Sequence, residues 1–290
     1  MTQDEETPIS WDLLLRYRLI EIIALWEGRL SSTHLCNAFG IGRQQASKDI
    51  GAYTKELAPG NLEYDGSLKG YKPTPAFCPK FTQGIAEEYL LLLTNNNQLG
   101  KTFKNLALGM ENTELLNVPI RDVKPEIIRA IVTAARQQKR LDVDYVSMHA
   151  PDREGRVIVP HTIVHTGLRW HVRAWCEKNS DYRDFVLSRF RGTPEIMDMS
   201  EHGVDADTAW QQEVTINLKP DRRLTEAQQS LVAADYGMTD NQLNITTRGC
   251  LVHYALWALR VDTKDNALQD NPVAQQIVVT NMNDLRRWLF

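Results

Sequence analysis

The chain has 290 residues, about twice the usual size of a single domain, so two or three domains are expected. Hydrophobic residues make up 42% and charged residues 24%, which is ordinary for a folded globular protein and argues against disorder throughout. The formal net charge of −4 excludes a surface that is basic everywhere, so any nucleic-acid surface must be local.

Three absences in the sequence narrow the class of protein further. The longest apolar stretch, 89–93, is too short to span a membrane, and residues 1–9 are polar and acidic, unlike a secretory signal. The cysteines lie far apart without a CxxC pair, which predicts a reduced, cytoplasmic location and no zinc site or disulfide framework. They are Cys36, Cys78, Cys176 and Cys250.

Residues 1–76 have the pattern of three helices and a hairpin. Ser10 and Gly28 bound the first expected helix, and a second, short helix runs to Phe39. Gly40-Ile41-Gly42 predicts a tight turn, and the third helix ends at Pro59-Gly60. Residues 62–71 then predict a two-stranded hairpin around Asp65-Gly66-Ser67.

Residues 77–137 predict a helical connector. One helix carries Ile85, Tyr89, Leu92 and Leu93 and is expected to end at Asn95-Asn96-Asn97. Pro125 marks the start of another, with Ile128 and Ile131 on one face.

The hydrophobic period changes to two after residue 138. Strands are expected around 142–147 and at 157–164, 170–176 and 185–190, with turn residues between them. Short strands at this spacing indicate a small barrel or sandwich over 138–200.

Residues 205–290 predict a small α+β domain. Strands at 214–218, 243–246 and 276–280 alternate with helices at 225–236 and 250–261, and 283–290 is amphipathic. The expected fold class is therefore multidomain α+β, with an N-terminal winged helix-turn-helix.

The third expected helix carries side chains that suit DNA recognition. Two helices joined by a tight turn and followed by a hairpin place a helix in the DNA major groove. Arginine and glutamine bond guanine and adenine edges, and the segment from Ile41 to Lys55 has three basic residues against one acid. The predicted base and phosphate contacts are Arg43, Gln44, Gln45, Ser47 and Lys48, with Lys69 and Lys72 on the wing. The alternative is a structural or protein-binding three-helix domain whose polar residues only meet water.

The strand region contains Trp170-His171-Val172 and, further on, Tyr182-Arg183-Asp184-Phe185-Val186-Leu187-Ser188-Arg189. These motifs resemble the WYL domain, a small Sm/SH3-like β-barrel of bacterial transcription regulators. The triplet that names the family falls on residues 170–172, where His171 and Val172 replace Tyr and Leu. Because His171 has no hydroxyl, a ligand contact that the family makes through a tyrosine hydroxyl at this position is not expected here.

The resemblance covers nearly the whole chain. It implies a winged helix at 1–76, a connector at 77–137, an effector-sensing WYL domain at 138–200 and a WCX-like dimerisation domain at 205–290. The layout is most similar to repressors of phage-defence operons next to BREX and CBASS systems. The resemblance therefore implies a homodimer that binds a palindromic double-stranded DNA operator. A nucleotide-like effector is expected to release the protein from the operator.

Strand alternation independently predicts an anionic effector site. Residues two apart share a strand face, so the side chains of Tyr145 and Ser147 point to one side, and those of His171 and Arg173 also point to one side. Arginines beside hydroxyl, imidazole and aromatic groups suit a phosphate and a stacked base. The predicted effector contacts are Tyr145, Ser147, His161, His171, Arg173, Arg183, Phe185 and Arg189. The alternative is that these arginines pair with Asp142, Asp144, Asp181 and Asp184 on a solvated surface.

The sequence gives less support to a metal site, a cofactor or an enzymatic activity. His161 and His165 share a face but lack a third ligand, so no metal is expected, and no cofactor motif is present. Enzymatic activity such as a nuclease is not expected, because no carboxylate cluster has metal-ligand spacing. The remaining alternative is a protein that binds RNA or single-stranded nucleic acid through an Sm-like barrel.

Overall fold

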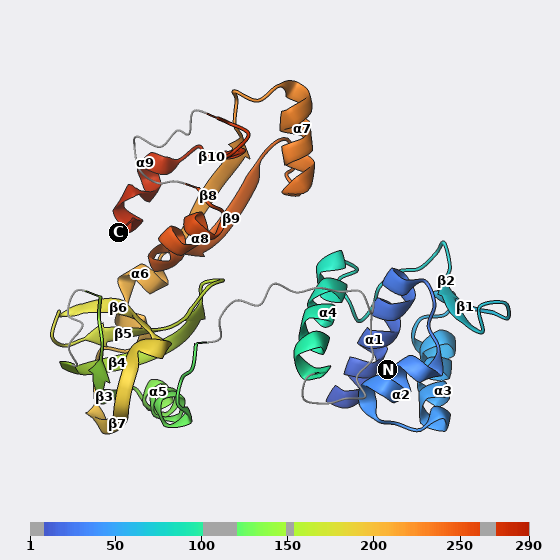
Figure 1. The fold of residues 1–290 in the computed structure, drawn as a ribbon, viewed down its shortest axis with the longest axis horizontal. Helices are drawn as coiled ribbons and strands as arrows, with labels where there is room; N and C mark the ends of the chain where they lie inside the picture. Colours follow the sequence, from blue (N-terminus) through green and yellow to red (C-terminus); the bar gives the residue numbers. More distant parts are fainter. Residues whose placement is uncertain (1–8, 101–120, 149–153, 262–270, 290) are drawn as a thin grey trace, which may run out of the picture. The chain divides into compact units, whose positions relative to one another are not determined.

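A computed structural model describes residues 9–100, 121–148, 154–261 and 271–289. The chain divides into two compact units, Met1–Val118 and Pro119–Phe290, and the elements of each appear in Figure 1. In the described residues, no helix is both long and apolar enough to cross a membrane.

The first unit is the expected winged helix-turn-helix. Its helices are α1 (Trp11–Glu27), α2 (Ser32–Phe39) and α3 (Arg43–Ala52), and α3 continues into the π-helical turn η1 (Tyr53–Leu57). Gly40 ends α2 in the left-handed conformation, with φ +64°, which a residue without Cβ adopts readily. The core consists of apolar side chains from all three helices, including Ile20, Leu35 and Ile50.

The hairpin of β1 (Leu62–Asp65) and β2 (Gly70–Pro73) forms the wing. Leu30, between α1 and α2, exchanges two backbone hydrogen bonds of 2.7 Å with Tyr71. Gly70 makes this close approach possible, because a Cβ there would lie 2.7 Å from the Leu30 carbonyl oxygen. The wing is therefore fixed to the helices along its second strand.

Two buried carboxylates hold the start of the connector against α1. Glu21 accepts hydrogen bonds from the Tyr53 hydroxyl, from the backbone N–H groups of residues 80–82 and from the Thr82 hydroxyl. Glu88 accepts from Arg18 and from the Gln83 backbone. These bonds satisfy carboxylates that would otherwise be costly to bury.

Helix α4 (Ala86–Gly100) begins where the connector helix was expected, but its predicted end at Asn95-Asn96-Asn97 is wrong. Asparagine costs a helix only about 0.7 kcal/mol per residue relative to alanine, so three of them need not terminate it. The weakly patterned stretch that was expected up to Pro119 lies outside the described residues.

The second unit begins with α5 (Pro125–Gln137), where Pro125 occupies the first helical position as expected. The following five-stranded antiparallel sheet has the order β6-β5-β4-β3-β7. Its strands are β3 (Lys139–Tyr145), β4 (Glu154–His165), β5 (Trp170–Cys176), β6 (Asp181–Val186) and β7 (Phe190–Met199). Helix α5 packs its apolar face on one side of the sheet (Figure 1).

This sheet is open, so the expectation of a closed Sm/SH3-like barrel is not confirmed. Strands β6 and β7 are its two edges, and no hydrogen-bonded pairing joins them within the described part of the chain. Closure of a barrel requires such a pairing between the first and last strands.

The strand expected at 185–190 is also wrong. Strand β6 ends at Val186, and a 3₁₀ turn, η2 (Leu187–Arg189), leads to β7. Phe185, Val186, Leu187 and Phe190 are all buried, so the segment is as apolar as a strand although its buried positions do not alternate. The chain instead turns here, because it must pass from one edge of the sheet to the other.

The C-terminal part has the predicted α+β pattern. After the short elements η3 (Val204–Ala206) and α6 (Thr208–Gln211) come β8 (Glu213–Pro220), α7 (Glu226–Asp235), β9 (Leu243–Arg248), η4 (Gly249–Leu251), α8 (Val252–Ala258), β10 (Ile277–Val279), α9 (Met282–Leu285) and η5 (Arg286–Trp288). The sheet has the order β10-β8-β9, and helices α7 and α8 contribute buried side chains to its core. Thr225 caps α7 in a reciprocal capping box with Gln228.

Candidate functional site

The outer face of α3 carries the predicted recognition residues. Arg43, Gln44, Ser47 and Lys48 are exposed, whereas Ala46 and Ile50 on the opposite face are buried in the core. The glycine that begins this helix, Gly42, leaves the first backbone N–H groups without a side-chain cap. The exposed face therefore offers guanidinium, amide, hydroxyl and ammonium groups side by side.

Gln45 is exposed but engaged within the helix. Its amide donates to Asp49 at 2.7 Å, and Arg16 of α1 lies 3.3 Å from the other carboxylate oxygen. This contact fixes the side chain of Gln45 against the protein.

The two predicted wing lysines differ in their surroundings. Lys69 is exposed at the tip of the hairpin. Lys72 lies 3.2 Å from the carboxylates of both Glu63 and Asp65 on the facing strand, which offset its charge. Arg29, which the sequence reasoning missed, is exposed beside the wing and donates from Nε to the Leu68 carbonyl at 2.7 Å.

The structure separates the eight predicted effector residues into different environments. Tyr145 and Phe185 belong to the core under α5, where their rings meet edge-on at 5.0 Å. The Tyr145 hydroxyl accepts a hydrogen bond from the Val186 backbone. Neither ring is available to stack on a base.

Arg183 and Ser147 lie at the margins of the sheet. Arg183 is exposed, 3.8 Å from Asp181, and faces the α5 side together with Ala174, its partner on β5. Ser147 follows β3, next to η2, because the Val146 N–H donates to the Arg189 carbonyl.

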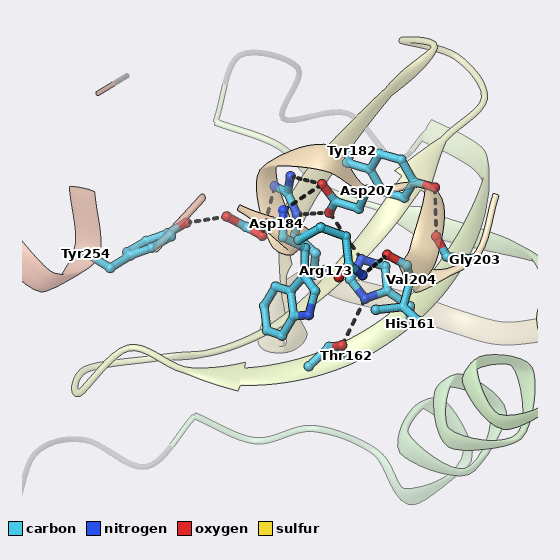
Figure 2. Close-up of polar contacts among 11 residues, drawn as sticks. His161, Thr162, Arg173, Tyr182, Asp184, Gly203, Val204, Asp207 and Tyr254 are labelled. Carbon is cyan, nitrogen blue, oxygen red and sulfur yellow. Dashed lines mark hydrogen bonds and ion pairs between the residues drawn. The ribbon is translucent and has the colours of Figure 1, made fainter. Parts of the chain in front are cut away.

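Arg173 and His161 form a buried polar cluster on the sheet face opposite α5 (Figure 2). The Arg173 guanidinium donates to Asp207 at 2.7 and 3.2 Å and to Asp184 at 3.4 Å. His161 Nε2 lies 3.2 Å from Asp207, which also caps α6 by accepting from the Trp210 N–H. The Tyr254 hydroxyl, from α8, lies 3.2 Å from Asp184.

In this cluster one guanidinium faces two carboxylates. Burial opposes ionisation of Asp207, but hydrogen bonds from His161 and Arg173 outweigh it and hold the pKa of that carboxyl well below its usual range. Burial raises the pKa of Asp184, although the charge of Arg173 counteracts the effect. Arg173 therefore ties the sheet to the segment before α6 through Asp207. Its contact with Asp184 agrees with the alternative of paired arginines, but the pair is buried and not on a solvated surface as that alternative expected.

His171 and Arg189 come together at one end of the sheet. His171 is buried at 5% exposure, and its Nδ1 has no hydrogen-bond partner within the described residues. Burial lowers the pKa of His171 to about 4; the backbone of Arg169 opposes this shift, and the positive charges of Arg169, Arg189 and Arg121 reinforce it. The ring of Tyr254 lies 5.3 Å from the His171 ring.

Sequence reasoning missed Arg121, Arg169, Asp207 and Tyr254. Arg121 and Arg169 lie just outside the expected helix and strand, so face alternation gave no signal for them. Asp207 and Tyr254 come from the segment that was treated as a separate domain. The described residues hold no group of three side chains suited to a metal ion, and His161 is engaged with Asp207.

Three family models match successive parts of the chain. Residues 12–95 match the winged helix-turn-helix domain of the BrxR transcriptional regulator, and residues 126–193 match the WYL domain. Residues 213–285 match the BrxR C-terminal dimerization domain. These domains, in this order, define a winged-helix WYL transcriptional regulator.

Curated relatives match this chain along nearly its whole length. The DNA-binding transcriptional repressor CapW of Stenotrophomonas maltophilia is 30% identical over 303 residues, covering 100% of this chain and 96% of that protein. CapW of Escherichia coli strain KTE188 is 33% identical over 277 residues, covering 95% and 91%. The chain belongs to the CapW and BrxR family, which confirms the expectation of a regulator rather than an enzyme.

Similarity to a solved structure is weaker. Proteasome accessory factor B/C of Arthrobacter aurescens aligns with 99% of this chain and 50% of its own, at 17% identity and a TM-score of 0.26. That TM-score is too low to support an argument.

Proposed function

We propose that the chain is a dimeric transcriptional repressor that binds a palindromic operator of a phage-defence operon. The observation that carries the proposal is the exposed face of α3, where Arg43, Gln44, Ser47 and Lys48 gather. Arginine bonds guanine in two places and lysine neutralises phosphates, while the opposite face of the helix is fixed in the core. A two-fold dimer would present two such helices to half-sites one or more DNA turns apart.

The wing contributes a second set of phosphate contacts in this proposal. Lys69 and Arg29 are exposed at the hairpin without a nearby acidic partner in the described residues, whereas Lys72 is offset by two carboxylates. Arg29 and Lys69 are therefore the stronger wing candidates, and Lys72 contributes less.

Repression is modulated by an anionic, nucleotide-like effector at the WYL domain. Of the predicted contacts, His171 and Arg189 support this part of the proposal, because they lie with other arginines and His171 Nδ1 lacks a partner among the described residues. The effector would favour an arrangement of the dimer that does not bind DNA, which shifts the population away from the operator. The rings of Tyr145 and Phe185, which were predicted to stack on a base, are buried, and this disfavours RNA binding through them.

The test is operator binding by the double variant Arg43→Ala/Lys48→Ala, measured by fluorescence anisotropy with DNA from upstream of the gene. We expect an affinity loss of at least about tenfold and a salt dependence reduced by about one to two charges, since both changes remove cationic contacts. The matched control, Arg129→Ala/Arg136→Ala, removes two exposed arginines from α5 and should bind as the unmodified protein does. Unchanged affinity in the α3 variant would contradict the proposal.

A further inference from the structure

Three arginines around His171 lack acidic partners in the described part of the chain. They come from different places: Arg121 precedes α5, Arg169 precedes β5, and Arg189 ends η2. Arg121 donates to the Leu168 carbonyl at 2.6 Å, which brings the segment before α5 to the turn that carries Arg169. Positive charge is thus concentrated at one end of the sheet.

Two buried polar atoms at this end have no partner within the described residues. They are Nδ1 of His171 and Nε of Arg169. Buried polar groups are nearly always hydrogen-bonded in proteins, and a local excess of positive charge attracts anions. Arg121 is exposed, and Arg169 and Arg189 are half-buried. Two unpartnered buried atoms beside three cations without acidic partners in the described residues indicate a site that an anionic ligand completes.

We propose that His171, Arg121, Arg169 and Arg189 form a site for a doubly charged phosphate, such as the terminal phosphate of a nucleotide, which binds together with one proton that His171 takes up. The inference rests on the proposed effector function and specifies its ligand class and its regulation. The three arginines supply charge-assisted, bidentate hydrogen bonds, for which a terminal phosphate offers three oxygens. An internal phosphodiester carries one charge and fewer free oxygens.

Proton uptake follows from the charges around His171. In the free protein the imidazole is neutral at pH 7, because burial and the three arginines disfavour its cationic form. A bound dianion reverses the local field, so the imidazole gains a proton and donates it to the ligand. Binding thus combines neutral His171, one proton and the dianion, and affinity rises as pH falls.

The other groups that face His171 do not take over this role. The Tyr254 ring packs on it from α8, and the Tyr254 hydroxyl is directed to Asp184. Asp184 is engaged by Arg173 at 3.4 Å. The strand neighbours of His171 are Val164 on β4 and Val186 on β6, which do not ionise.

The experiment is calorimetry on the full-length protein with three probes. Inorganic sulfate stays a dianion from pH 6 to 8, so its binding reports protonation of the protein alone. Thymidine 5′-phosphate is a dianion and its phosphate methyl ester is a monoanion. Their affinities therefore show the effect of the second phosphate charge on the same nucleoside. Titrations in buffers of different ionisation enthalpy count the protons taken up.

We expect sulfate to bind several-fold more tightly at pH 6 than at pH 8, with net uptake of up to one proton per chain. Thymidine 5′-phosphate should bind at least about tenfold more tightly than its methyl ester at pH 7.5. No binding of sulfate or the phosphate at millimolar concentration, or binding without proton uptake, would overturn the proposal.

Variants assign the effect to residues. His171→Asn should abolish proton uptake, and Arg189→Gln should weaken both dianions at least about tenfold. Arg183→Gln removes the same charge from the α5 side of the sheet and should change neither result. Operator binding by each variant checks that it is folded. If operator binding persists while the probes fail to bind, this site is wrong and the proposed repressor is not.

Discussion

Arg173 illustrates how the buried charges of this protein are used. One guanidinium bonds Asp207 from the segment before α6 and Asp184 from β6. With one partner removed, the remaining charges stay buried and uncompensated, which is far more costly than a lost surface ion pair. We therefore regard Arg173 as a positioning residue that fixes the segment before α6 on the sheet.

Arg173→Leu should lower the free energy of unfolding by about 3–5 kcal/mol, because two carboxylates remain without their cation. Urea unfolding of the full-length protein measures this loss. Arg183→Leu is the control, since its exposed ion pair with Asp181 is expected to change stability by less than about 0.5 kcal/mol. Equal effects of the two variants would contradict the assigned role.

His171 gives stability its own dependence on pH. Its pKa of about 4 lies below the ordinary value of 6.5, so the unfolded chain binds the proton more readily. The contribution of neutral His171 to the free energy of unfolding is therefore fully present above pH 6.5 and is lost as pH falls toward 4. In a buffer without phosphate or sulfate, this contribution should fall by about 2 kcal/mol between pH 7 and pH 5.

His171→Gln should remove that part of the pH dependence, measured as the difference between unfolding free energies at pH 7 and pH 5. His165→Gln, at an exposed position of β4, should leave it in place. The assignment fails if both variants retain the full difference.

At the scale of elements, the wing and α3 form one rigid surface. Helix α3 is fixed through Ala46 and Ile50, and the wing is fixed through the Leu30–Tyr71 bonds. The spacing between recognition residues and wing cations is therefore set by the fold, so loosening the wing should affect DNA binding even without loss of a contact residue.

Gly70→Ala tests this rigidity. The added Cβ would lie 2.7 Å from the Leu30 carbonyl oxygen, a backbone atom that cannot move without breaking the hydrogen bonds to Tyr71. We expect a stability loss of about 1–3 kcal/mol and weaker operator binding, measured by thermal unfolding and anisotropy. Gly66→Ala, at the open tip of the hairpin, should behave as the unmodified protein does. Unchanged stability and operator binding of Gly70→Ala would show that the close approach between Gly70 and Leu30 is not needed.

At the scale of the whole molecule, the chain divides its tasks between two units with separate cores. The first unit carries the candidate DNA surface, and the second carries the WYL and dimerization domains. A net charge of −4 spread over the chain weakens non-specific attraction to DNA. Tight binding then depends on two reading helices that engage together.

Separate expression of residues 1–100 and 121–290 should therefore give a monomer and a dimer, respectively, in analytical ultracentrifugation. The first fragment should bind the operator at least about a hundredfold more weakly than the full chain, because the second half-site is no longer supplied at high effective concentration. Equal affinity of the fragment and the full chain would show that dimerization does not contribute to operator binding.

Local sequence pattern was enough to predict the elements whose formation depends on near neighbours in the chain. Period and caps located the three helices, the wing, β5 and α7, and they separated the exposed face of α3 from its buried face. Tertiary structure decided what depends on distant partners. Alternation placed Arg173 and His171 on one face, but it could not show that Asp207 pairs with Arg173 or that the charges of Arg121 and Arg189 act on His171. A linear pattern fixes which way a side chain points, whereas its charge partner is set by how strands and turns far apart in the chain meet.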